Sequence, residues 1–182
     1  MSGSKALIDI ASRNSDPDEA LAMMVSMRWP KGVACPECGR MDLRFIAPRR
    51  LWECKTKHAR RQFTAKRGTV FEDSALGLDI WFATVWMIAN DTPPNSFDLQ
   101  RELGVTQKTG WLMLHRIQLA METETFRNKL IETRAPSETQ RFRALMQRLL
   151  CVSRSEIDEK ERQWKATGPH TRTSRLPRRV SG

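Results

Sequence analysis

The chain lacks any long apolar run. None of its 182 residues lie in a hydrophobic stretch that approaches the roughly 18 residues needed to span a bilayer. Its start has no apolar core of the kind that a secretory signal peptide needs. It has 4 cysteines, and their spacing is typical of metal ligands rather than of a disulfide framework, which favours a reducing compartment. We therefore expect a cytoplasmic protein with no membrane partner.

Acidic residues are scarce in the middle of the chain. Between Arg40 and Arg67 the acids are Asp42 and Glu53 alone, against ten basic residues. The basic residues are Arg40, Arg44, Arg49, Arg50, Lys55, Lys57, Arg60, Arg61, Lys66 and Arg67. The whole chain agrees, with a net charge of +10 and a pI of about 10.1. Scattered solvated charge is the simpler alternative, but so uneven a balance favours a surface that binds the phosphates of nucleic acid.

Four residues have the spacing of zinc ligands. Cys35 and Cys38 are separated by two residues, and Cys54 and His58 by three. Each short loop lets two ligand atoms reach one ion, and the longer arm between the pairs lets them complete the tetrahedron that Zn²⁺ prefers. Gly39 suits the tight turn after Cys38. We predict one structural zinc ion per chain, held by Cys35, Cys38, Cys54 and His58.

The remaining pattern predicts a small α+β protein. We expect an N-terminal helix within residues 1–30, a zinc ribbon of β-hairpins at 31–67, a helix-turn-helix at 76–122, a C-terminal helical pair at 138–165 and a disordered basic tail at 166–182. Strands are predicted at 43–46, 51–54 and 62–65. A chain of this length has room for one or two small domains and not for a large enzyme core.

The helix-turn-helix is predicted from caps and apolar spacing. A supporting helix spans 78–90, Ser96 caps a short helix ending at Leu103, and Thr106 caps a second helix ending near Met121. Leu99, Leu103, Val105, Trp111, Leu114 and Ile117 are expected to form its core. The first turns of the second helix would then face outward with Gln107, Lys108, Thr109 and Gly110, where side chains reach bases or phosphates. A plain helical hairpin is the alternative.

The C-terminal pair carries an apolar stripe that includes Leu145 and Leu149, and Ser153 with Glu156 forms a capping box. Cys151 lies in this apolar stretch and is expected in the core. Arg172, Arg175, Arg178 and Arg179 belong to the basic tail, which would add non-specific phosphate contacts.

Linked motifs run through residues 16–122 of the sequence. They are Trp29-Pro30-x-Gly32-Val33-x-Cys35-Pro36-x-Cys38-Gly39, Trp52-Glu53-Cys54, Arg60-Arg61-Gln62-Phe63-Thr64, Gly68-Thr69-Val70-Phe71 and Glu102-Leu103-Gly104-Val105-Thr106-Gln107-Lys108-Thr109-Gly110-Trp111. Together these motifs resemble a known family, the insertion-sequence transposases that combine an N-terminal zinc ribbon with a DDE-type nuclease. Many members have cysteine where His58 stands here, but histidine is an equally good zinc ligand.

The resemblance implies a nuclease domain after the helix-turn-helix, and this chain departs from that pattern. About sixty residues follow Met121, too few for the RNase-H-like fold that holds the catalytic carboxylates. Glu122, Glu124, Glu132 and Glu138 are better explained as helix-surface charges. We therefore expect a truncated relative that has no catalytic residues and is not an enzyme.

The sequence thus predicts a zinc-dependent, nucleoid-associated bacterial protein that recognises the ends of an insertion element in double-stranded DNA without cleaving them. The predicted DNA contacts are Arg49, Arg50, Arg60, Arg61, Lys66, Arg67, Gln107, Lys108 and Thr109. Two alternatives remain open. The chain could be a protein-interaction module that self-associates through its C-terminal helices, or an accessory subunit of a complex whose nuclease is supplied in trans.

Overall fold

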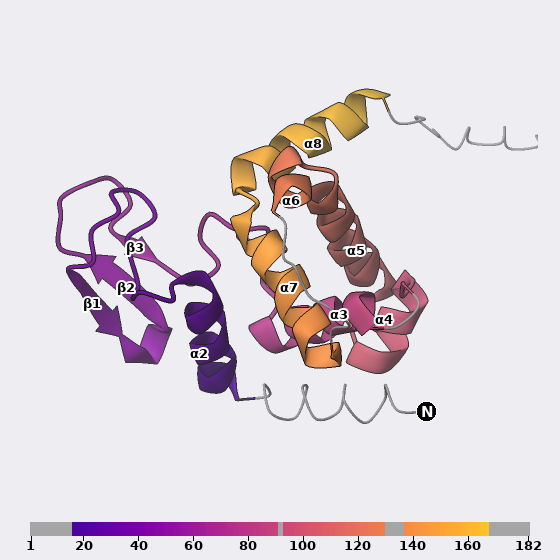
Figure 1. Ribbon diagram of the computed structural model, residues 1–182, viewed down its shortest axis with the longest axis horizontal. Coiled ribbons are helices and arrows are strands. Elements are labelled where there is room, and N and C mark those ends of the chain that lie inside the picture. Colours follow the sequence, from indigo (N-terminus) through magenta and orange to yellow (C-terminus); the bar gives the residue numbers. More distant parts are fainter. Residues whose placement is uncertain (1–15, 91–92, 130–136, 168–182) are drawn as a thin grey trace, which may run out of the picture.

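The computed structural model describes residues 16–90, 93–129 and 137–167. They form a small α+β fold in which a three-stranded sheet lies at one end and a group of helices at the other, with helix α2 (Pro17–Arg28) between them (Figure 1). The fold class is as predicted. Residues 1–15 and 168–182 lie outside the described residues, whereas residues 166 and 167, predicted to begin the disordered basic tail, are helical. No helix in the described part of the chain is long and apolar enough to cross a membrane.

The sheet is antiparallel, in the order β1-β2-β3. Strands β1 (Leu43–Ile46) and β2 (Leu51–Cys54) have the predicted bounds and are joined by a short 3-10 turn, η1 (Ala47–Arg49). Strand β3 (Gln62–Phe63) is shorter than predicted, because the Thr64 carbonyl accepts a hydrogen bond from the Arg67 amide in a turn rather than continuing the strand.

Aromatic side chains give the ribbon a core of its own. The ring of Trp52 lies 6.0 Å from that of Phe63 and 5.9 Å from that of Trp29, and Phe45 covers Trp52 at 5.0 Å. The register that pairs Trp52 with Phe63 across β2 and β3 places these rings on one side of the sheet. The zinc ligands are therefore attached to a packed hairpin.

The helical body is built around α3 (Leu78–Asn90), whose side chains from Trp81 to Met87 are all buried. Around it lie α4 (Ser96–Leu103), α5 (Gln107–Met121), α6 (Glu124–Asn128), α7 (Glu138–Cys151) and α8 (Arg154–Thr167). Phe142 of α7 packs against Phe82 and Trp86 of α3. The C-terminal helices are thus part of one core with the helix-turn-helix.

Helices α4 and α5 form the predicted helix-turn-helix. Gly104 ends α4 with a φ of 66°, and the side chain of Thr106 accepts a hydrogen bond from the backbone of Thr109 to begin α5. The cap of α4 is Asn95, not Ser96 as predicted. Asn95 and Asp98 make a reciprocal capping box, so Ser96 is the first helical residue.

Three burial predictions were wrong. Trp111 was assigned to the core and is exposed, whereas Gly110 was expected to face outward and is buried. A side chain at Gly110 would meet the carbonyl oxygen of Ser96 at 3.0 Å, because α4 and α5 cross closely at this point. Cys151, predicted in the core, ends α7 on its exposed side.

Basic side chains fix the linker between the ribbon and the helices, residues 68–75. The Lys66 ammonium donates to the carbonyls of Ser74 and Leu76, and burial lowers its pKa. From the helical body, Arg116 donates to the Glu72 carbonyl at 2.9 Å and Arg154 to the same oxygen at 3.4 Å. The segment from Thr69 to Phe71 is fully buried. The linker is therefore a packed element that holds the ribbon against the body.

Candidate functional site

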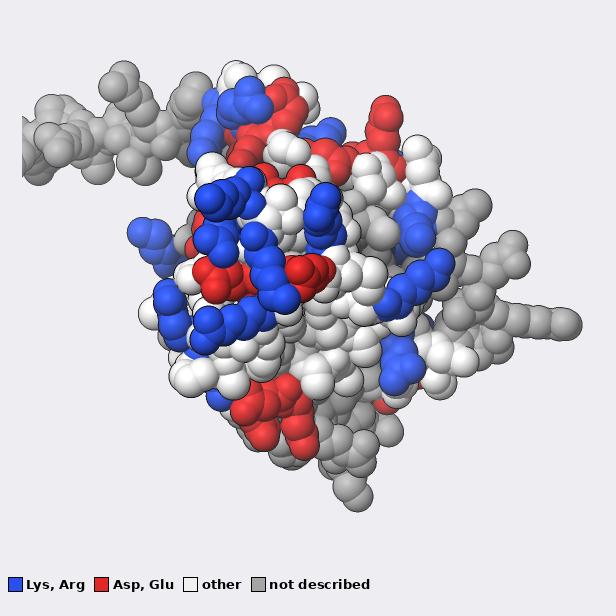
Figure 2. Space-filling view, turned by 90° about the vertical axis from the view of Figure 1, so that its left-hand side faces the viewer, with Lys and Arg blue, Asp and Glu red and all other residues white. Residues whose placement is uncertain are grey.

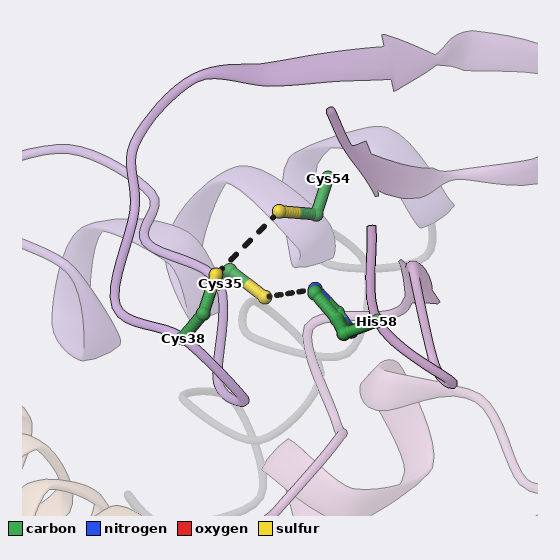
Figure 3. A group of neighbouring side chains, drawn as sticks. All are labelled: Cys35, Cys38, Cys54 and His58. Carbon is green, nitrogen blue, oxygen red and sulfur yellow. Dashed lines mark hydrogen bonds between the residues drawn. The ribbon is translucent and has the colours of Figure 1, made fainter. Parts of the chain in front are cut away.

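The four predicted zinc ligands converge at the end of the ribbon (Figure 3). Cys35 and Cys38 come from the loop before β1, Cys54 ends β2, and His58 lies in the loop toward β3. Their ligand atoms all lie within 4.8 Å of one another. No other group of three or more histidine, cysteine or acidic side chains comes this close within the described residues.

Backbone hydrogen bonds shape both loops. The Gly39 amide donates to the Cys35 carbonyl at 2.8 Å, and the Cys35 amide donates to the Arg40 carbonyl at 2.9 Å. Gly39 has a φ of 71°, which a glycine adopts without strain. On the other side, the Cys54 amide donates to the Arg61 carbonyl at 2.8 Å, which closes the loop that carries His58. Local turns, not distant contacts, place the ligands.

Two of the distances between ligand atoms match the edges of a tetrahedral zinc site. Cys35 Sγ lies 3.4 Å from His58 Nε2, and Cys38 Sγ lies 3.6 Å from Cys54 Sγ. The bond lengths of zinc to sulfur and nitrogen imply ligand-to-ligand edges of about 3.5–3.8 Å. Burial raises the pKa of the Cys54 thiol, but contacts with His58, Thr56 and Cys38 outweigh it and lower that pKa to about 6. A thiolate is the form that binds zinc.

The donor set makes this zinc structural. Three sulfurs and one imidazole nitrogen fill all four positions and leave none for a reacting water. The Nε2 atom of His58 faces the sulfurs, while its Nδ1 is buried without a hydrogen-bond partner among the described residues. The cofactor prediction, one structural zinc ion per chain, is thus confirmed.

The ten basic residues from Arg40 to Arg67 fall into two groups. The first group is held by neighbours: Arg50 pairs with Asp18, Lys55 with Asp42, Arg61 with Glu53, and Arg67 with Glu37 and Glu72. The Arg61 guanidinium also donates to the carbonyl of Cys54. Lys66 belongs to this group through the linker carbonyls described above. These side chains brace the ribbon.

The second group is exposed and makes no ion pair or side-chain hydrogen bond within the described part of the chain. It consists of Arg40, Arg44, Arg49, Lys57 and Arg60. Basic side chains gather over the ribbon end of the molecule, with a few acidic ones among them (Figure 2). We call this second group the free basic surface. Of the predicted phosphate contacts, Arg49 and Arg60 belong to it.

The start of α5 presents the other predicted contacts. Gln107 and Lys108 are exposed, and the Gln107 side chain donates to the Ser96 hydroxyl at 3.2 Å. Thr109 is half-buried and its hydroxyl lies 2.8 Å from that of Thr106, so it belongs to the helix cap. No acidic residue lies in this first turn.

Sequence reasoning missed an aromatic group on α5. Trp111 stacks on His115 at 4.9 Å, and Trp164 of α8 lies 4.6 Å from the same histidine. The spacing of Trp111 and His115, one helical turn apart, placed them on one face, but nothing in the sequence indicated that α8 would cover that face.

The fold and site together define a zinc-ribbon protein with a helix-turn-helix. Residues 15–58, which include all four ligands, match the family model described as the transposase zinc-ribbon domain. The predicted resemblance is confirmed for this domain.

The chain is also similar to a protein of Halobacterium salinarum described as an uncharacterized protein in transposable element ISH50. The two are 31% identical over 105 residues, which is 57% of this chain and 35% of the relative. The chain thus matches about a third of the length of that relative. No solved structure matches the chain.

Proposed function

We propose that this chain is a zinc-dependent DNA-binding protein, related to transposases, that recognises the end of an insertion element in duplex DNA. The observation that carries the proposal is the free basic surface on a ribbon whose four zinc ligands lie within the residues that match the transposase zinc-ribbon domain. When exposed cations without internal partners neutralise phosphates, the nucleic acid releases its condensed counterions, which gives the protein affinity for nucleic acid. Such a protein acts in the cytoplasm, at the nucleoid.

The two halves have different roles in the proposal. Arg49, Arg50, Arg60 and Arg61 on the ribbon contact phosphates, and Arg50 and Arg61 first exchange their present partners for the DNA. Gln107 and Lys108 at the start of α5 approach base edges in the major groove. Lys66, Arg67 and Thr109 were predicted as contacts too, and their internal bonds support a bracing role instead.

We further propose that these residues do not cleave DNA. In-line phosphodiester cleavage commonly uses two metal ions about 4 Å apart, held by carboxylates. The described residues offer no carboxylate group of that kind, since the cluster of possible ligands they contain is the zinc site. Supercoiled plasmid incubated with Mg²⁺ or Mn²⁺ should stay intact. Nicking that disappears on mutation of one acidic residue would overturn this part of the proposal.

A second candidate function is that of an accessory subunit to a nuclease supplied by another chain. It is favoured by the similarity to a relative that is much longer than the matched segment. Copurification of a nuclease with the full chain would support it. A protein-interaction module that binds no DNA is the remaining alternative.

The deciding experiment is a salt titration of binding to duplex DNA, with element-end duplex and shuffled duplex compared at each salt concentration. Binding of phosphates makes the logarithm of the affinity fall steeply with the logarithm of the salt concentration, at about 0.9 per phosphate neutralised. The zinc-free protein is the matched control and should lose the ribbon contribution. A protein that binds neither duplex at low salt would refute the proposal.

A further inference from the structure

Two large apolar side chains lie exposed on the outward face of α5. The fractional exposure is 44% for Trp111 and 51% for Leu112. Both lie in the second turn of the helix, on the side away from the buried residues Met113 and Ile117. A helix that only packed against its neighbours would bury such side chains or replace them with polar ones.

These side chains adjoin the polar residues at the helix start. Residues four positions apart lie next to one another on a helix, so Leu112 adjoins Lys108 and Trp111 adjoins Gln107. The four residues make one patch, with a cation and an amide on its N-terminal half and apolar groups on the other. With no acid in the first turn, the patch complements a polyanion.

The far end of the patch is rigid. Trp111 stacks on His115 with an angle of 12° between the rings, and Trp164 of α8 packs edge-on against His115 at 4.6 Å. Trp164 also lies 6.2 Å from the ring of Trp111, so helix α8 borders the patch and fixes the orientation of Trp111 while leaving it partly exposed. A side chain held in place loses less conformational entropy on binding.

We infer that Leu112 and Trp111 contact the 5-methyl groups of thymine in the major groove. The inference rests on the proposed function and specifies which groups on the bases α5 recognises. Major-groove edges carry polar groups that Gln107 and Lys108 match, and thymine is the base that adds an apolar group there. The patch combines an amide and a cation with apolar side chains on one rigid helix face. This combination fits the major-groove edge of a thymine base pair better than it fits an apolar protein surface.

The test uses wild-type protein and a duplex selected by it from random sequences. Each thymine of the selected site is replaced in turn by deoxyuridine, which removes the methyl group and leaves every hydrogen-bonding group unchanged. At one or more positions we expect affinity to fall about fourfold, the effect of burying one methyl group. Replacements outside the selected site should have no effect.

Protein variants then assign the contact. Leu112→Ala should lose the preference for thymine over uracil at the position that Leu112 contacts, and keep it at any position that Trp111 contacts. The variant should keep the melting temperature of the wild type, because Leu112 is half exposed. Met121→Ala is the matched control: it removes another exposed apolar side chain, from the last turn of the same helix, and should keep the preference for thymine.

Other outcomes overturn the inference in distinct ways. If the protein selects a site but does not distinguish thymine from uracil there, the inference is wrong and the proposed function stands. If Leu112→Ala dissociates a dimer and leaves the preference for thymine unchanged, the patch is an interface between copies of the chain. Failure to bind any duplex would refute the proposed function itself.

Discussion

Arg49 and Arg67 belong to the same basic segment of sequence but make different interactions. Arg67 is bound to Glu37 and Glu72, and its charge is largely compensated inside the protein. Arg49 is exposed and makes no ion pair within the described residues. The number of basic residues in the ribbon therefore overstates the charge available to a ligand.

The zinc site is the first residue-level test. Cys54→Ser removes a buried thiolate ligand, so we expect the protein to lose its one zinc ion by elemental analysis and residues 31–66 to become sensitive to protease. Cys151→Ser is the matched control, because Cys151 is exposed and far along the chain from the cluster. Full zinc content in Cys54→Ser would refute the ligand set.

His115 should make the stability of the helical body depend on pH. Burial lowers the pKa of His115. The carboxylates of Glu161 and Glu122 act in the opposite direction, and the ammonium of Lys165 lowers the pKa further. The unfolded chain then binds a proton more readily than the folded chain. The stability that neutral His115 contributes to the folded protein is therefore complete above the unfolded pKa of about 6.5, and it is lost as the pH falls toward the lower pKa of the folded protein.

The measurement is the difference in unfolding free energy between wild type and His115→Gln across pH 7.5 to 5. Subtraction removes the acid sensitivity of the zinc site, which both proteins share. We expect the wild type to lose stability relative to the variant as the pH falls. Parallel curves would show that the histidine titrates normally between the two tryptophans.

At the residue scale, the sequence predicted chemistry better than it predicted burial. The spacing of Cys35, Cys38, Cys54 and His58 identified the zinc site, because a short loop brings together the two ligands of each pair and the hairpin of β1 and β2 brings the pairs together. Trp111 was wrongly assigned to the core, since its exposure depends on where α8 lies. Gly110 was wrongly assigned to the surface, because its burial depends on the close approach of α4, which the sequence does not show.

At the scale of elements, the ribbon and α5 should contribute differently to binding. Replacing Arg49 and Arg60 by alanine should weaken binding to all duplexes alike and reduce the salt slope by about one to two units, because each binds a phosphate. These two are cleaner choices than Arg61, whose guanidinium supports the strand that carries Cys54. Arg162→Ala on α8, where Arg162 pairs with Glu159, is the control and should leave the slope unchanged.

Replacing Gln107 and Lys108 by alanine should instead reduce preference for a selected site, by about 1–3 kcal/mol for each side chain that binds a base edge through two hydrogen bonds. Non-specific affinity should change little. The readout is the ratio of affinities for selected and shuffled duplex. A ratio that follows Arg49 and Arg60 would reverse the two roles.

Element bounds followed from local signals. The cap at Thr106 begins α5 as predicted, and α4 ends at Leu103 as predicted, directly before the αL glycine Gly104. The short helix α6 was not predicted, because its five residues are too few to show a period. Its cap, Thr123, is buried and begins the turn that leads from α5 toward α7.

At the scale of the whole molecule, the linker joins the ribbon and the helices into one unit. Arg116→Met should remove the hydrogen bonds to the Glu72 and Val70 carbonyls and leave Glu72 only the longer contact with Arg154. We expect the unfolding free energy to fall by about 1–3 kcal/mol. Hydrogen exchange at residues 68–75 should accelerate while the zinc content stays at one per chain.

Arg101→Met is the matched control for that variant. Arg101 pairs with Asp98 and Glu102 on the surface of α4, and its removal should change stability by about 0.5 kcal/mol or less. Equal effects from both variants would mean that the linker does not hold the two parts together. The sequence placed this segment correctly between the ribbon and the helices, but the arginines that clamp it come from positions far along the chain.

The packed linker also fixes the distance between the ribbon and α5. A flexible tether would let the ribbon and α5 settle on DNA at many separations, whereas a clamped one imposes a single distance and a single side of the double helix. Inserting about five base pairs between the two DNA segments bound by the ribbon and by α5 should turn them to opposite sides and abolish joint binding, because B-form DNA repeats every 10 to 10.5 base pairs or so. A loosened linker, as in Arg116→Met, should tolerate that insertion. Footprinting of the wild type and the variant on both duplexes would measure whether both DNA segments stay protected when the spacing changes.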